Sequence, residues 1–77
     1  MDNINWRDYI YSDPDILVGK PVVKGTRLSV KFIIRLLANG WTEQQVLENY
    51  PRLTQKSLCA IFAYKIDHPE KIFNNMN

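Results

Sequence analysis

Residues 29–39, with the sequence SVKFIIRLLAN, constrain the fold more than any other part of this chain. Four apolar side chains recur there at the spacing that places them on one face of an α-helix: Val30, Ile33, Ile34 and Leu37. Phe32 and Leu36 widen this face to more than half of the helix circumference. A helix with so broad an apolar face must be covered on two sides. We expect one cover to be the other helices, and the second to be an N-terminal hairpin or a second subunit.

Capping residues predict where the helices begin and end. Ser29 is a favourable N-cap for the first helix, and Gly40 suits the left-handed position that follows this helix. Thr42 and Gln45 have the spacing of a capping box at the start of a second helix, which Pro51 ends. The inner face predicted for this second helix consists of Val46, Leu47 and Tyr50.

The third helix is predicted to begin after Thr54, its N-cap, and to end before the His68-Pro69 pair. We expect its buried stripe to consist of Leu58, Ile61, Phe62 and Ile66, with Cys59 at the margin. The outward face then holds Gln55, Lys56, Ala60, Ala63, Tyr64 and Asp67. Two helices joined by a tight turn, after a longer buried helix, are the outline of a helix-turn-helix domain.

The N-terminal third contains most of the turn signals. We expect Val22-Val23 and residues 26–28 to form a small β-hairpin, with Gly25 supplying a positive φ at the turn. Residues 16–18 are predicted to be a short extended segment that follows a turn.

The predicted organisation is a single domain over residues 1–77. It consists of an N-terminal β-arm (1–28), a three-helix core (29–68) and a short tail (69–77). We expect Ile72 and Phe73 of the tail to dock on the core or on a partner.

Opposite charges are segregated in the first half of the chain. Residues 1–15 contain four aspartates and one arginine, whereas residues 16–42 contain five lysines and arginines and no acid. In a chain with a formal net charge of +2, this cationic segment indicates an anionic partner or an acidic protein surface. The alternative is that these side chains simply face water.

Few residues are suited to catalysis or metal binding. Cys59 is the only cysteine and His68 the only histidine, so neither an internal disulfide nor a zinc cluster is expected. The sequence has no Ser-His pair, His-carboxylate pair or glycine-rich phosphate loop, and we expect a non-enzyme without a cofactor. The start does not resemble a signal peptide, and no apolar run approaches the ~20 residues that span a bilayer. We therefore expect a cytoplasmic protein.

The outward face of the third helix is poorly suited to reading DNA bases. Direct readout favours Arg, Asn and Gln, whereas this face offers only Gln55 and Lys56, and Asp67 would repel phosphate. Its two alanines instead permit another surface to approach closely, and Tyr64 is of a type enriched in protein interfaces.

Three segments resemble a known family. Residues 19–30, GKPVVKGTRLSV, resemble the pattern Gly-x-Pro-x-Ile-x-Gly-Thr-Arg-Ile-x-Val of the short prokaryotic domain-of-unknown-function family 433. Residues 40–47 (GWTEQQVL) and 50–54 (YPRLT) are similar to two further parts of that family's pattern. The resemblance extends over about residues 8–66 and implies a homeodomain-like three-helix fold with an N-terminal β-arm. For some members it implies the role of antitoxin beside a PIN-like ribonuclease toxin.

Two functions are compatible with these observations. The first is the antitoxin of a type II toxin–antitoxin module, a homodimer that neutralises a PIN-like ribonuclease and binds operator DNA. The second is a dimerisation or protein-interaction module that does not bind DNA. The candidate contacts with DNA or a partner are Lys24, Arg27, Lys31, Arg35, Gln55, Lys56 and Tyr64. The candidate dimer or docking surface consists of Phe32 and Leu36.

The segment Gly25-Thr26-Arg27 also has a purely structural interpretation. In that interpretation Gly25 makes the turn, Thr26 bonds to the local backbone and Arg27 pairs with an N-terminal aspartate. In the functional interpretation, Lys24 and Arg27 contact phosphate or an acidic toxin surface, and the cations of the first helix extend that contact.

Overall fold

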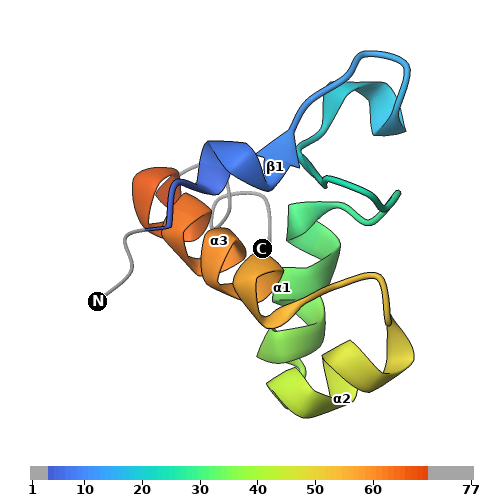
Figure 1. Ribbon diagram of the computed structural model, residues 1–77, viewed down its shortest axis with the longest axis vertical. Helices are drawn as coiled ribbons and strands as arrows, with labels where there is room; N and C mark the ends of the chain where they lie inside the picture. Colours follow the sequence, from blue (N-terminus) through green and yellow to red (C-terminus); the bar gives the residue numbers. More distant parts are fainter. Residues whose placement is uncertain (1–3, 70–77) are drawn as a thin grey trace.

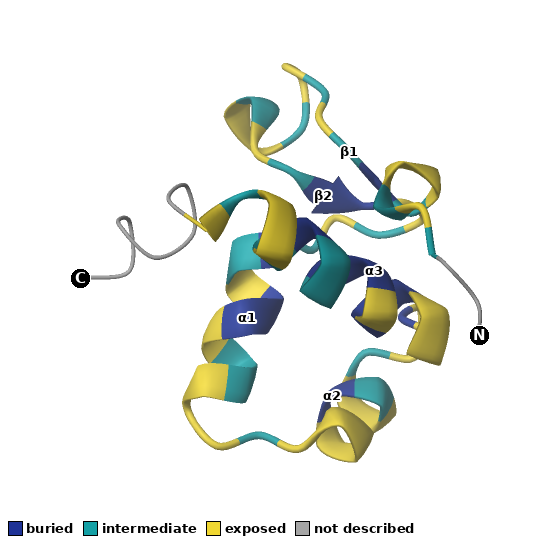
Figure 2. Ribbon diagram, turned by 90° about the vertical axis from the view of Figure 1, so that its left-hand side faces the viewer, coloured by how far each residue is buried: buried dark blue, intermediate teal, exposed yellow. Residues whose placement is uncertain are grey.

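The computed structural model of the chain describes residues 4–69. Its elements are η1 (Trp6–Asp8), β1 (Ile10–Tyr11), η2 (Leu17–Gly19), β2 (Val22–Val23), α1 (Val30–Ala38), α2 (Glu43–Asn49) and α3 (Gln55–Asp67). The strand pair lies at one end of α1 and α3, and α2 lies at the other end (Figures 1 and 2). The mainly-α, three-helix class with a short N-terminal β-structure is confirmed. The predicted positions of Ile72 and Phe73 lie outside the described residues.

The helices begin and end where their caps predict. The Ser29 hydroxyl accepts a hydrogen bond from the Phe32 backbone N–H at 3.0 Å. At α2 both hydrogen bonds of the capping box are present: the Thr42 hydroxyl accepts from the Gln45 N–H at 3.0 Å, and the Gln45 side chain accepts from the Thr42 N–H at 2.9 Å. Gly40 ends α1 with a φ of +98°. Since these signals are local, the sequence alone was sufficient to place them.

The core is built mainly by α1 and α3 (Figure 2). Its largest fully buried side chains are Ile33, Leu58, Ile61, Val22, Val23, Val30 and Val46. Leu36 is half-buried against this core, as a broadly covered α1 requires. Phe32 is 37% exposed and contacts the Tyr50 ring edge-to-face, with the centroids 5.7 Å apart. One side of Phe32 is therefore covered by the residue that ends α2, rather than by the hairpin.

The prediction of which α3 side chains are buried is wrong in part. Ala60 and Tyr64, which were expected to face outward, are 0% and 5% exposed. Ile66, which was expected in the buried stripe, is 77% exposed. The reason is that the N-terminal segment packs on α3 and covers the side that carries Tyr64.

Trp6 of η1 makes most of this contact with the last turn of α3. Its indole N–H donates to Asp67 Oδ2 at 2.7 Å, across 61 residues of sequence. Its ring meets the Tyr64 ring edge-to-face at 4.8 Å, and Tyr64 stacks on His68 at 4.1 Å. The Arg7 guanidinium lies 4.4 Å from the centre of the Trp6 ring. We name Trp6, Tyr64, Asp67 and His68 the aromatic clasp.

The β-structure differs from the predicted hairpin. β2 pairs antiparallel with β1, with Ile10 opposite Val23, and only a single bridge joins Val22 to Ser29 on its other edge. The loop between β2 and α1 is nevertheless closed as a turn, because the Val23 N–H donates to the Leu28 carbonyl at 3.0 Å. β1, the strand that pairs with β2, was not predicted, because it lies in the segment before β2 and the hairpin was expected with the segment after it.

Residues 12–20 project from the helical body as an arm (Figure 1, blue to cyan). The extended conformation predicted for residues 16–18 is wrong, since η2 occupies the tip of this arm. Leu17 and Val18 have φ values of +50° and +57°. A β-branched residue in the left-handed region is strained by roughly 1–3 kcal/mol. Both side chains are exposed, Leu17 at 43% and Val18 at 91%.

Candidate functional site

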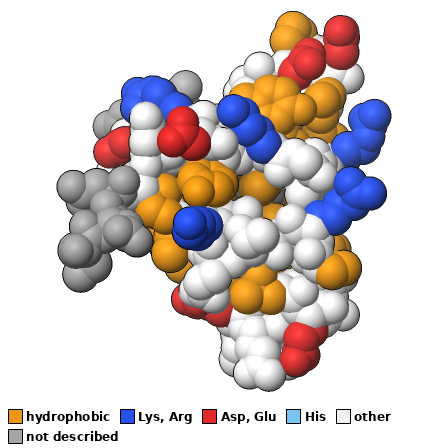
Figure 3. Space-filling view, viewed as in Figure 1, with side chains coloured by type: hydrophobic (Ala, Val, Ile, Leu, Met, Phe, Trp, Pro, Cys, Tyr) orange, Lys and Arg blue, Asp and Glu red, His pale blue; other side chains and the backbone are white. Residues whose placement is uncertain are grey.

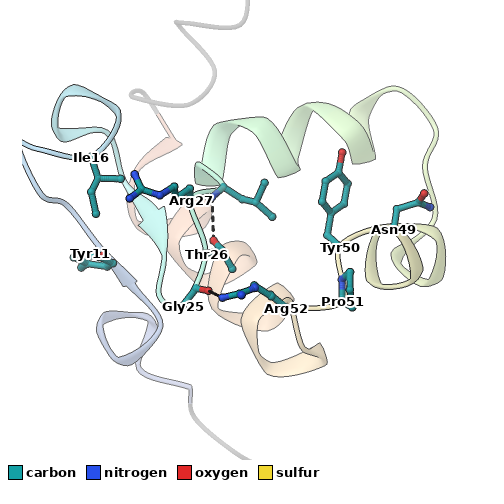
Figure 4. A pocket seen from close by; sticks show the side chains of 10 residues that line it. Tyr11, Ile16, Gly25, Thr26, Arg27, Asn49, Tyr50, Pro51 and Arg52 are labelled. Atoms are coloured by element: carbon teal, nitrogen blue, oxygen red, sulfur yellow. Dashed lines mark hydrogen bonds between the residues drawn. The ribbon is translucent and has the colours of Figure 1, made fainter.

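An open groove of about 740 Å³ separates the base of the arm from the turn between α2 and α3 (Figure 4). Its lining residues are Tyr11, Ile16, Gly25, Thr26, Arg27, Leu28, Asn49, Tyr50, Pro51 and Arg52. Two segments far apart in the sequence, Gly25–Leu28 and Asn49–Arg52, therefore face each other across it. No aspartate or glutamate is among the lining residues.

The Gly25–Leu28 wall is held rigid by Thr26. Its hydroxyl donates to the Val23 carbonyl at 2.8 Å and accepts from the Leu28 N–H at 3.0 Å. Gly25 has a φ of +81°, so the predicted roles of Gly25 and Thr26 in a local turn are confirmed. The Lys24 N–H also donates to the Tyr9 carbonyl at 2.8 Å, which fixes the loop to the N-terminal segment.

Arg52 links the two walls. Its Nη1 donates to the Gly25 carbonyl at 3.3 Å across 27 residues of sequence (Figure 4). The remaining N–H groups of this guanidinium are available to an anion, since a carbonyl occupies only one of five donors. The aromatic ring of Tyr50 and the ring of Pro51 form the apolar part of this wall.

Arg27 lies on the opposite wall, and its side chain extends towards Ile16 (Figure 4). Within residues 4–69 it forms no salt bridge, so the pairing with an N-terminal aspartate is wrong for Asp8, Asp13 and Asp15. Lys24, Lys31 and Arg35 likewise make no side-chain hydrogen bond or salt bridge with any described residue. We name Lys24, Arg27, Lys31 and Arg35 the cationic row. Arg35 and Lys24 are exposed, whereas Lys31 is half-buried.

Figure 3 shows Lys and Arg side chains along one edge of the molecule, below the acidic side chains at the end of the arm. The acidic residues of the arm are Asp13 and Asp15. Cations and acids that form no ion pair within residues 4–69 attract opposite charges on another molecule.

The predicted contacts on α3 are not part of the groove. The Gln55 amide donates to Glu43 Oε1 at 3.1 Å, which ties the start of α3 to α2. Lys56 is exposed beside Cys59, and Ile66 is the largest apolar residue exposed on this helix.

Tyr64 was wrongly predicted to be an exposed anchor. It is buried in the aromatic clasp, and burial raises the pKa of its phenol above the ordinary value.

Tyr50 and Arg52 were not predicted to be site residues. The signal was present, because YPRL was recognised as a connection between helices. Only the fold brings this connection opposite Gly25 and Arg27.

The described part of the chain gives no sign of a metal site or of a membrane span. Among residues 4–69 no group of three or more His, Cys, Asp and Glu side chains is placed to hold a metal ion. Within the same residues no helix has the length and apolar character needed to cross a bilayer.

The fold and the groove define a small three-helix domain in which α2 and α3 form a helix-turn-helix outline beside an N-terminal β-arm. The chain belongs to the family described as "Protein of unknown function (DUF433)", whose pattern matches residues 10–64. It is 39% identical over 59 residues to the uncharacterized protein y4eO of Sinorhizobium fredii, covering 74% of this chain and 27% of that protein.

A solved structure shares this fold. The crystal structure of a DUF433 member from Anabaena variabilis superposes with a TM-score of 0.83 at 28% sequence identity. The match covers 90% of this chain and 68% of that one. The predicted family is therefore confirmed, and with it the three-helix fold.

Proposed function

We propose that the protein is the antitoxin of a type II toxin–antitoxin module, which acts in the cytoplasm by binding a PIN-like ribonuclease toxin and catalyses no reaction itself. The observation that supports this role is the cationic row. Its members have no intramolecular partner among residues 4–69, although the arm beside them carries acids. Unpaired surface cations steer association with an acidic protein and disfavour other partners.

The test is co-purification with the product of the adjacent gene. We expect a complex that weakens as the salt concentration rises, because exposed charges are screened. The variant Lys31→Glu with Arg35→Glu should lose the complex, since both cations lie on the outer side of α1. The matched control is Lys20→Glu with Lys71→Glu, two cations outside the cationic row, which has the same change in net charge and should retain it. Equal binding by both variants would contradict the proposed surface.

A second activity, binding of duplex DNA for autoregulation, is favoured by the helix-turn-helix outline of α2 and α3. The exposed face of α3 argues for sequence-independent contact, because Gln55 is engaged by Glu43 and Ile66 is apolar. Binding to DNA from the upstream region of the operon should therefore depend steeply on salt, with a log–log slope of about −0.9 per phosphate contact. Absence of binding at low salt would leave the alternative, a protein-interaction module without DNA binding.

A further inference from the structure

We propose that two copies of the chain form a symmetric dimer by reciprocal docking, in which residues 13–18 of each copy bind in the groove of the other. This dimer uses the groove and the arm, and it does not depend on the proposed antitoxin function. Its two surfaces are both present in one chain, which is the condition for a closed two-fold interface.

The tip of the arm has the character of a segment that another surface covers. Leu17 and Val18 are 43% and 91% exposed, and both belong to η2 on the arm that projects from the helical body (Figure 1). Their left-handed backbone, with φ values of +50° and +57°, presents both side chains outward. A strained, apolar and exposed pair is unfavourable in a monomer, and contact with a partner compensates for it.

The charges of the arm and the groove are complementary. The arm carries Asp13 and Asp15, and the groove contains Arg27 and Arg52 with no acid in its lining. Within residues 4–69 neither aspartate forms a salt bridge with a cation of its own chain. Arg52 is held in position by the Gly25 carbonyl, and its other N–H groups can donate to a carboxylate in two-point contact.

The apolar parts also correspond. Tyr50 and Pro51 line one wall of the groove, and they provide a surface for Leu17 and Val18. Ile16 lines the groove of its own chain, so the tip begins directly beside the groove mouth (Figure 4). A two-fold axis close to Ile16 places each tip over the opposite groove. Lys31 and Arg35 are not among the residues that line the groove.

Sedimentation equilibrium of the purified chain tests the proposal, over loading concentrations from about 1 µM to 1 mM. We expect a monomer–dimer equilibrium in which Val18→Asp raises the dissociation constant about 100-fold, because each dimer contains the contact twice. The matched control is Ile66→Asp, which places the same charge on the exposed face of α3 and should leave the equilibrium unchanged. Far-UV circular dichroism confirms that both variants remain folded.

A charge exchange provides the second measurement. Asp15→Arg and Arg27→Asp should each weaken the dimer about tenfold, since exposed ion pairs are individually weak but occur twice. The double variant should recover most of this loss. A chain that is monomeric at every concentration overturns the proposal. So does a dimer that is insensitive to Val18→Asp, or one in which the double variant is no tighter than the two single variants.

Discussion

Replacement of Trp6 by alanine should destabilise the fold strongly, although this residue lies in a short N-terminal segment. Three contributions are lost. The edge-to-face contact with Tyr64 at 4.8 Å is worth roughly 1 kcal/mol, and the hydrogen bond to Asp67 at 2.7 Å is worth roughly 1 kcal/mol at this exposed position. Partial burial of the indole adds ~2 kcal/mol. We expect a loss of about 4 kcal/mol, where the whole domain has roughly 4–12 kcal/mol.

Urea unfolding followed by far-UV circular dichroism measures this loss. Trp6→Phe separates the contributions, because it keeps a ring against Tyr64 and removes only the hydrogen bond to Asp67. It should cost about 1 kcal/mol, and the cost should vanish in an Asp67→Ala background, which has no acceptor, if that hydrogen bond is its source. A loss below about 1 kcal/mol for Trp6→Ala would show that the N-terminal segment does not stabilise α3.

Three other predictions concern the loop, a cap and the buried phenol. Gly25→Ala should lower the melting temperature, with a cost of roughly 1–2 kcal/mol from its φ of +81° alone, since no atom lies within 4 Å of the added methyl group. Thr42→Ala should cost about 1 kcal/mol in chemical denaturation by removing the capping box, whereas Thr42→Ser should be nearly neutral. The raised pKa of Tyr64 means that the unfolded chain ionises this phenol first, so the free energy of unfolding should fall as the pH rises above about 10. The free energy of unfolding of the Tyr64→Phe variant should fall less over the same pH range. An identical pH profile for both proteins would contradict the burial of this hydroxyl.

The helices were predictable because their signals are local. Ser29, Thr42 and Thr54 cap their own helices within three residues, and no distant contact is needed to recognise them.

The face of α3 was not predictable in the same way. Nearly every position from Leu58 to Ile66 is apolar or aromatic, so the sequence periodicity does not choose between its faces. The choice is made by Trp6, which covers the side of Tyr64 and leaves Ile66 exposed.

Only one wall of the groove was predictable from the sequence. Arg27 was identified from its charge, but the opposite wall depends on how the α2–α3 turn lies against the β2–α1 loop. A single backbone carbonyl, that of Gly25, receives the Arg52 side chain and brings the walls together. No property of Arg52 in the sequence distinguishes this role from that of any other exposed cation.

The hydrogen bond between Trp6 and Asp67 has a consequence for the order of folding. It closes a loop of 61 residues, and the entropy lost in closing so long a loop makes this contact slow to form. The helices α1 and α2 pack against each other and are close neighbours in the sequence, so this pair can assemble earlier. The N-terminal strand and its tryptophan then join an existing scaffold. Opening of this last-formed contact would expose the final turn of α3 to hydrogen exchange before the rest of the domain unfolds.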